Sequence, residues 1–155
     1  MSRISRTTYV DAALQLLEGA GFKVSRAAGG RLLAKKGVRT LFVDVAGKNL
    51  PYRGNDGSSC FAWETWIAPA RLDRLEQDAA NNKAEPWLAF CYAIIEDQYR
   101  TQVGATVALD GVEFGARLIA AARFRAHMVD RSPSWGEVNL PREEVLHLTC
   151  EAKGL

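Results

Sequence analysis

Two uninterrupted apolar segments constrain this chain more than any other feature of its sequence. Leu41-Phe42-Val43 lies inside a predicted strand, Val38 to Val45, and a second segment runs from Trp87 to Ile95. Successive side chains of a strand point to opposite faces of its sheet, so a strand that is apolar at every position must be covered on both faces. The two segments therefore predict a sheet packed between helices.

Two amphipathic segments could supply those helices. The first helix is expected to begin near Tyr9, with Thr7 or Thr8 as its N-cap, because apolar residues then recur at helical spacing. The second is expected to begin at Pro69, since proline suits the first helical position, and to end at Asn81-Asn82.

The remaining segments are shorter and their patterns are weaker. The expected strands are Phe22–Arg26, Arg31–Lys35 and Val103–Leu109; Val112–Phe124 is expected to be a helix, Val145–Cys150 a strand or a short helix, and Gly47–Cys60 a loop. This order of elements predicts an α/β or α+β fold with helices on the faces of a mixed sheet.

Length and composition fit a single domain. The 155 residues suit one core, and 48% of them are apolar, which is enough to fill it. Charged residues make up 25%, as in ordinary soluble proteins. No apolar run approaches the roughly 20 residues that span a bilayer, and the N-terminus lacks the apolar stretch of a signal peptide. We therefore expect a cytoplasmic protein with no membrane segment.

Cysteine and histidine spacing argues against a zinc site. Cys60, Cys91 and Cys150 are far apart and form no CxxC pair, and His127 and His147 form no HxxxH or HExxH pattern. We expect both histidines to be structural or surface residues, and Cys91, flanked by aromatics, to be a buried inert thiol.

Charge is distributed unevenly along the chain. Residues 1–53 hold ten Lys/Arg and three Asp/Glu, whereas residues 54–155 hold ten Lys/Arg and fifteen Asp/Glu. A basic half suggests an acidic partner such as nucleic acid. The alternative is that folding mixes the two halves and leaves no basic patch.

Four stretches together resemble the archaeal Holliday junction resolvases and the wider PD-(D/E)xK nuclease superfamily. They are "ALQLLEGAGFKVSRA", "GGRLLAKKG", "LFVDVAGK" and "ARLDRLEQDAANNKAEPWLAFCYAI". The resemblance covers a nuclease-like core of about residues 7–96 and leaves 97–155 as an extension with no assigned role. It implies an α/β restriction-endonuclease-like fold, a central mixed β-sheet flanked by helices, with DNA as partner and a homodimer as the assembly.

The resemblance also implies a chemistry. Such nucleases use Mg²⁺, held by two acidic residues with a lysine nearby, to organise water and stabilise charge on the phosphate. In this sequence Asp44 occupies the second acidic position, and Arg31 stands where the first is expected. Ala46 stands at the lysine position, and Lys48 follows two residues later. The motif is therefore degenerate.

Three residues are the candidates for catalysis. Asp44 is the predicted metal ligand, Lys48 a substitute for the missing lysine, and Glu64 a further carboxylate that reaches Asp44 if the "FAWETW" segment pairs with its strand. The alternatives are an aspartate paired with a cation at the solvent end of a strand, and a solvated loop lysine. Trp63 and Trp66 beside Glu64 could stack on bases, although core packing is the better interpretation.

Basic residues lie on or beside the same predicted edge. They are Arg26, Arg31, Lys35, Lys36, Lys48 and Arg53. Contacts from lysine and arginine to phosphate need no metal. The sequence therefore predicts a nucleic-acid-binding, nuclease-like protein, catalytically degenerate, in DNA repair, recombination or a mobile element. If active, it would be a Mg²⁺-dependent endodeoxyribonuclease. The alternative is a non-enzymatic protein-interaction or inhibitory module on the same fold.

Overall fold

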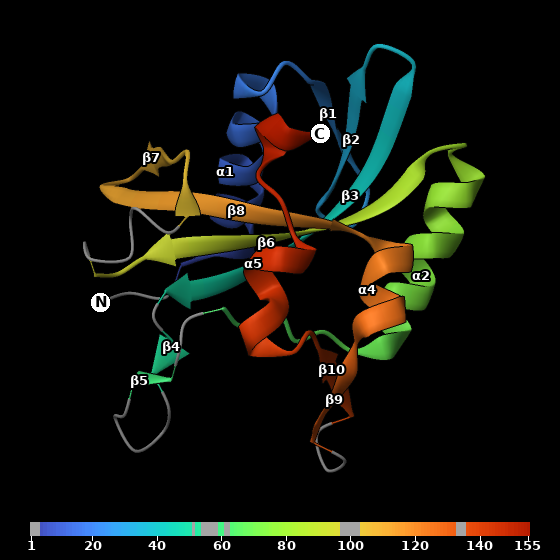
Figure 1. Ribbon diagram of the computed structural model, residues 1–155. Coiled ribbons are helices and arrows are strands. Elements are labelled where there is room, and N and C mark those ends of the chain that lie inside the picture. The colour runs from blue at the N-terminus through green and yellow to red at the C-terminus, as the bar shows by residue number, and fades with distance from the viewer. Residues whose placement is uncertain (1–3, 51, 54–58, 61–62, 97–102, 133–135) are drawn as a thin grey trace.

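A six-stranded mixed sheet forms the centre of the molecule (Figure 1). The computed structural model describes residues 4–50, 52–53, 59–60, 63–96, 103–132 and 136–155. In spatial order the strands are β1 (Lys23–Ala27), β2 (Arg31–Lys36), β3 (Arg39–Leu50), β6 (Glu85–Ile94), β8 (Val112–Ala120) and β7 (Val107–Leu109). Only β3 and β6 run parallel; the other neighbours in this sheet are antiparallel.

Helices cover both faces of this sheet. On one face lies α1 (Arg6–Gly19), which packs into one apolar cluster; on the other lie α2 (Pro69–Asn81), α4 (Ala121–His127) and α5 (Val145–Leu148), which share a second (Figure 1). The predicted α/β class, with a central mixed sheet between helices, is confirmed. We call the two sides the α1 face and the α2 face.

Small elements complete the described chain. They are the hairpin β4 (Tyr52–Arg53) and β5 (Ser59–Cys60), the pair β9 (Val129–Ser132) and β10 (Glu137–Asn139), and the 3₁₀ turns η2 (Arg142–Glu144) and η3 (Ala152–Gly154). Among the described residues, no helix is long and apolar enough to cross a membrane.

The alternation along β3 decides which of its side chains lie together. Leu41, Val43 and Val45 belong to the apolar cluster of the α1 face. Phe42 and Ala46 belong to the cluster of the α2 face. Because strand side chains alternate, Asp44 and Lys48 also lie on the α2 face. The strand thus carries its two polar side chains on the side of α2.

The predicted loop at Gly47–Cys60 is wrong in its first part. β3 continues to Leu50, and Tyr52–Arg53 pairs with Ser59–Cys60; Gly54–Ser58 lie outside the described residues. Gly47 lies within strand β3, and this position needs glycine because a Cβ there would lie 2.2 Å from the ring of Tyr9. Glycine in a strand often marks such a close approach.

The predicted helix over Val112–Phe124 is also wrong for most of its length. Residues 112–120 form β8, and only Ala121–His127 are helical. The alternate residues Val112, Phe114, Ala116 and Leu118 pack on the α1 face, which is the period of a strand. Asp110 and Gly111 have φ angles of 51° and 78°, the left-handed pair that joins a tight hairpin.

Other expectations need smaller changes. The cap of α1 is Ser5 rather than Thr7 or Thr8, and its hydroxyl accepts a hydrogen bond from the backbone amide of Thr8 at 3.3 Å. Only Val107–Leu109 of the predicted strand at 103–109 is a strand, and Val145–Leu148 is the short helix. The helix at Pro69 and the strand beginning near Trp87 are confirmed.

Candidate functional site

Asp44 lies in the interior of the sheet, not at its solvent edge. It is opposite Arg31 on β2 and beside Leu88 on β6, and it is only 1% exposed. An ionised carboxylate at such a place must be paired and hydrogen-bonded, because burying an isolated charge is very costly. Its partners therefore decide what this site can do.

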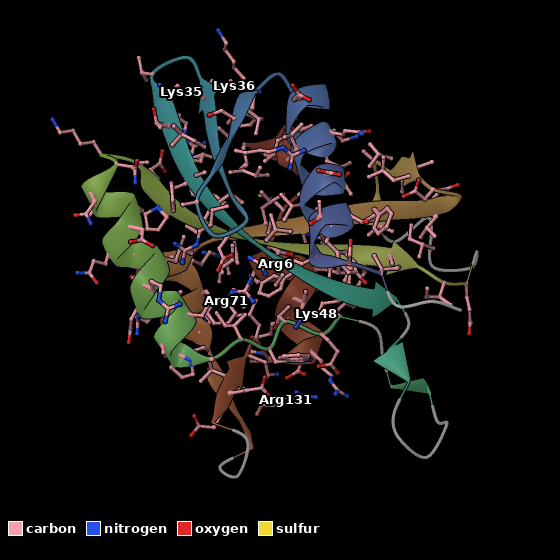
Figure 2. All side chains as sticks on the ribbon, turned by 180° about the vertical axis from the view of Figure 1, so that it is seen from behind. Arg6, Lys35, Lys36, Lys48, Arg71 and Arg131 are labelled. Carbon is pink, nitrogen blue, oxygen red and sulfur yellow. The ribbon has the colours of Figure 1, made fainter. Side chains whose placement is uncertain are left out.

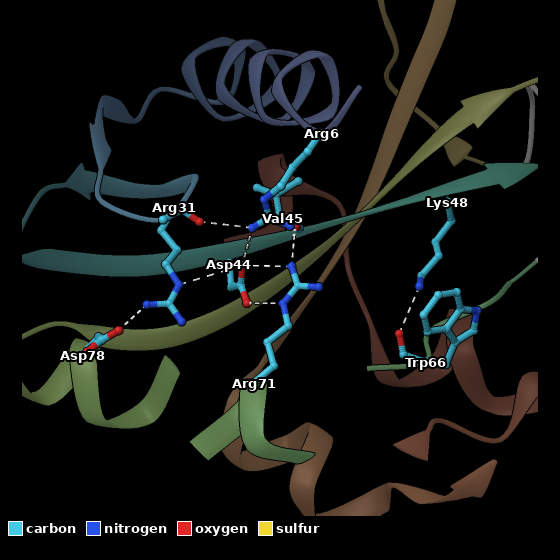
Figure 3. Close-up of polar contacts among 9 residues, drawn as sticks. Arg6, Arg31, Asp44, Val45, Lys48, Trp66, Arg71 and Asp78 are labelled. Atoms are coloured by element: carbon cyan, nitrogen blue, oxygen red, sulfur yellow. Dashed lines mark hydrogen bonds and ion pairs between the residues drawn. The ribbon is translucent and has the colours of Figure 1, made fainter. Parts of the chain in front are cut away.

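Three arginines surround the Asp44 carboxylate (Figure 3). Arg71 donates from Nε to Oδ2 at 2.7 Å and from Nη2 to Oδ1 at 3.1 Å. Arg6 donates from Nη2 to Oδ1 at 3.1 Å. Arg31 places its Nε 3.9 Å from Oδ1 and forms a closer ion pair with Asp78. We call Arg6, Arg31 and Arg71 the arginine cluster.

The cluster is assembled from three different elements. Arg6 is the first residue of α1, Arg71 the third residue of α2, and Arg31 the first residue of β2. Backbone carbonyls fix two of them further: Arg6 donates to Gly29 at 3.3 Å and Arg71 to Val45 at 2.8 Å. The first turns of both helices thus lie beside one buried carboxylate.

The surroundings of Asp44 do not suit Mg²⁺. Both carboxylate oxygens accept hydrogen bonds from guanidinium groups, and Mg²⁺ needs several oxygen ligands in near-octahedral geometry. Three permanent positive charges also stand where a cation would have to bind. Among the residues described, no group of three or more His, Cys, Asp or Glu side chains could hold a metal ion.

Lys48 is buried in β3 rather than solvated in a loop. It is 8% exposed, its Nζ donates to the backbone carbonyl of Trp66 at 3.0 Å, and the same atom lies 3.2 Å from the centroid of the Trp66 ring (Figure 3). Burial, assisted by the positive charge of Arg71, lowers the pKa of Lys48 to about 7. Lys48 shares a face with Asp44 but is directed toward Trp66.

No family model matches this chain, and no curated protein matches it. One solved structure that does match is that of Hjc, a Holliday junction resolvase from the archaeal hyperthermophile Archaeoglobus fulgidus, with a TM-score of 0.54 at 14% identity. The match covers 91% of this chain and 94% of that chain. This chain has the restriction-endonuclease-like fold of a Holliday junction resolvase. The predicted resemblance is confirmed at the level of the fold.

On this resolvase-like fold, Glu64 lies apart from Asp44. Glu64 is 2% exposed, and its carboxylate accepts a hydrogen bond from Arg142 at 2.6 Å, while its backbone carbonyl accepts one from Tyr92 at 2.9 Å. No contact between Glu64 and Asp44 is found among the described residues. Among the described residues, no hydrogen bond or ion pair joins any two of the three catalytic candidates, although the charge of Glu64 acts on Lys48.

The two tryptophans beside Glu64 have different surroundings. Trp63 is a core residue, packed edge-to-face on Tyr92 with centroids 5.2 Å apart. Trp66 is half-buried and lies near two cations: besides Lys48, the guanidinium carbon of Arg131 lies 4.9 Å from its ring centroid. The core interpretation therefore holds for Trp63, whereas Trp66 packs against basic side chains.

The predicted nucleic-acid-binding residues that the structure describes do not form one patch. Arg26 lies on the α1 face, where its Nη2 is 2.5 Å from Asp11. Lys35 and Lys36 lie at the far end of the β1–β2–β3 region, away from Arg6 and Arg71 (Figure 2). Only Arg31 joins the cluster; Arg53 belongs to β4, and its side chain lies outside the described residues.

Sequence reasoning missed Arg6 and Arg71. Only Arg71 carried a signal, because it is a basic residue in the first turn of the helix expected at Pro69, where the macrodipole disfavours positive charge. Arg6 precedes the expected start of the first helix near Tyr9 and carried none. In the structure, Asp44 compensates both charges.

Proposed function

We propose that this chain is a nucleic-acid-binding protein with a nuclease-like fold, and that it does not cut by a carboxylate-bound metal. The observation that carries the proposal is the pairing of Asp44 with three arginines at the position where the resemblance predicts a metal ligand. Guanidinium groups repel a divalent cation but bind phosphate well.

The solvent exposure of Arg6 and Arg71 supports a role in binding nucleic acid in addition to pairing with Asp44. The side chain of Arg6 is 48% exposed and that of Arg71 is 30% exposed, so both reach solvent while holding a buried carboxylate. Lys48 and Arg131 lie on the same side of the molecule (Figure 2), but Lys48 is buried and Arg131 is paired with Glu137, so the proposal rests on the two exposed arginines. Phosphate contacts of this kind provide affinity without reading sequence.

The resolvase-like fold supports DNA as the nucleic acid, a homodimer as the assembly, and repair, recombination or a mobile element as the setting. These are parts of the proposal. If residual cleavage exists, it belongs to Asp44 and Lys48 with Mg²⁺, and it would require the arginines to leave Asp44.

The experiment is a binding titration with labelled duplex and four-way-junction DNA across a range of salt concentrations, with and without Mg²⁺. We expect binding in EDTA, with affinity falling steeply as salt rises. Failure to bind either DNA at low salt would reject the proposal and favour the protein-interaction alternative. Mg²⁺-dependent cleavage lost in Asp44→Ala would restore the enzyme interpretation.

A further inference from the structure

We propose that Arg6 and Arg71 form a metal-independent binding site for a phosphate group, with Asp44 as the carboxylate that positions both. The inference deepens the proposed function, on which it rests, by naming the atoms that would contact nucleic acid. Three independent features of the described residues support it: charge, free donors and helix orientation.

The first feature is an excess of positive charge. Arg31 is neutralised by its ion pair with Asp78, so the single charge of Asp44 is shared between Arg6 and Arg71. Both donate to the same oxygen, Oδ1, at 3.1 Å, which holds two guanidinium groups as close neighbours. The single negative charge of Asp44 offsets only one of the two positive charges, so repulsion between the guanidinium groups remains. A phosphate bound there would neutralise the excess.

The second feature is unused hydrogen-bond capacity. A guanidinium carries five N–H donors. Arg71 uses Nε and Nη2 on Asp44 and Val45, and Arg6 uses Nη2 on Asp44 and Gly29. Within the described part of the chain, Nη1 of Arg71 and both Nε and Nη1 of Arg6 donate to no protein acceptor. These groups are free to donate to phosphate oxygens.

The third feature is the orientation of two helices. α1 and α2 both begin beside Asp44, since Arg6 and Arg71 belong to their first turns. The positive ends of both helix dipoles therefore add to the guanidinium charges, and helix N-termini favour phosphate. Neither first turn contains an acidic residue that would oppose this field.

The pKa of Lys48 is affected by the same excess of positive charge. Arg71 is among the causes that lower the pKa of its ammonium group, after burial itself. An anion beside Arg71 would weaken that repulsion. Lys48 is thus a neighbouring charge that responds to occupancy of the site, whereas the direct contacts belong to the two arginines.

The test compares two matched variants. Arg6→Gln removes one guanidinium from the site, while Asp44 keeps Arg71 and Arg31. Arg39→Gln is the control, because Arg39 is also a partly exposed arginine on one carboxylate, Glu85, at 3.1 Å, but lies at the other end of β3. Circular dichroism and thermal melting establish that both variants are folded.

The readout is the affinity for a short fluorescent oligonucleotide in EDTA. We expect Arg6→Gln to bind about tenfold more weakly and Arg39→Gln to bind within about twofold of the unmodified protein. Equal losses in the two variants, or unchanged affinity in Arg6→Gln, would overturn the site while leaving DNA binding by the protein intact.

A second measurement does not depend on nucleic acid. Sodium sulfate should raise the melting temperature more than sodium chloride at equal ionic strength, and part of that gain should vanish in Arg6→Gln but not in Arg39→Gln. The part that persists in both is the general salting-out effect of sulfate. Identical gains in all three proteins would count against an anion site. An Arg6-dependent gain without DNA binding would retain the site and reject the proposed function.

A comparison of oligonucleotides with different 5′ ends shows whether the site binds a terminal phosphate or an internal phosphodiester. Tighter binding of a 5′-phosphorylated strand than of its 5′-hydroxyl counterpart, lost in Arg6→Gln, assigns the site to a terminal phosphate. Equal binding of the two strands, weakened equally by Arg6→Gln, assigns it to internal phosphodiesters. Both results support the site.

Discussion

Arg71 binds Asp44 through two parallel hydrogen bonds, from Nε at 2.7 Å and from Nη2 at 3.1 Å. This bidentate geometry matches the planar guanidinium to the planar carboxylate and uses both acid oxygens. The same Nη2 donates to the carbonyl of Val45 at 2.8 Å, so one side chain ties the first turn of α2 to the centre of β3. The ion pair therefore has a structural role as well as the proposed binding role.

Asp44→Asn should destabilise the fold strongly and leave nucleic-acid binding intact. The change removes the one negative charge shared by Arg6 and Arg71, and breaking a buried ion pair costs about 3–5 kcal/mol. Urea denaturation measures this loss. The folded variant should bind DNA at least as tightly as the unmodified protein, because the asparagine oxygen can still accept the hydrogen bonds that position Arg6 and Arg71 and the remaining cluster is more positive.

The matched control for this change is Asp73→Asn. Asp73 pairs with Arg125 at 2.7 Å on an exposed surface, where such pairs contribute about 0–1 kcal/mol. If Asp44→Asn costs no more than Asp73→Asn, the buried cluster is not a stabilising unit. If it abolishes DNA binding in protein shown to be folded, the negative charge of Asp44, and not only its hydrogen-bonding oxygen, is needed to position Arg6 and Arg71.

Lysine at position 71 should not restore the stability that Arg71 provides, so Arg71→Lys should be destabilising. A lysine ammonium keeps the charge but cannot form two parallel bonds to Asp44 and also reach Val45. We expect a loss of about 1–3 kcal/mol in urea unfolding, in line with the loss of charge-assisted hydrogen bonds. Arg74→Lys, at an exposed position of the same helix, should lie within about 0.5 kcal/mol of the unmodified protein.

The sequence predicts the partner of Asp44 on β2 once the hairpin is recognised. Gly37, with φ of 61°, lies in a two-residue turn between Lys36 and Arg39, and this turn fixes the register that sets Arg31 opposite Asp44. The fold class follows from the two apolar segments in the same direct way, because covered strands require helices on both sides.

The other two arginines of the cluster could not be placed beside Asp44 from the sequence. Arg6 and Arg71 are 38 and 27 residues from Asp44 along the chain, and only the packing of α1 and α2 brings them to it. The sequence predicts a loop at Lys48 because Gly47 precedes it. The close approach of the Tyr9 ring, which requires that glycine within a strand, is a tertiary contact with no local signal.

Mg²⁺ should have no specific effect through Asp44. Because the arginines occupy both oxygens of Asp44, Mg²⁺ has no ligand set there, and a ligand that does not bind the native state cannot stabilise it. We expect the melting temperature to be the same in Mg²⁺ and in EDTA at matched ionic strength. A saturable rise with Mg²⁺ that disappears in Asp44→Asn would identify a metal site and contradict our interpretation.

Lys48 should make stability depend on pH. Its pKa is lowered to about 7 in the folded protein from an ordinary value of 10.5, so between these values the unfolded chain binds more protons than the native state. The free energy of unfolding must then rise with pH in this interval and be lowest below the folded pKa. Burial is the main cause of the lowered pKa. Of the charged groups that face Lys48, Arg71 of α2 and Arg131 of β9 lower its pKa further, whereas Glu137 of β10 and Glu64, in the segment before α2, raise it.

The measurement is urea unfolding of the unmodified protein and of Lys48→Met at pH 7 and pH 9. Methionine keeps the length and apolar stem of the side chain but does not titrate, and every other group is common to both proteins. The unmodified protein should gain about 2 kcal/mol relative to Lys48→Met over these two pH units. Parallel pH profiles would show that Lys48 keeps an ordinary pKa, and a relative loss on raising the pH would show that its ammonium form is stabilised by the carboxylates of Glu64 and Glu137.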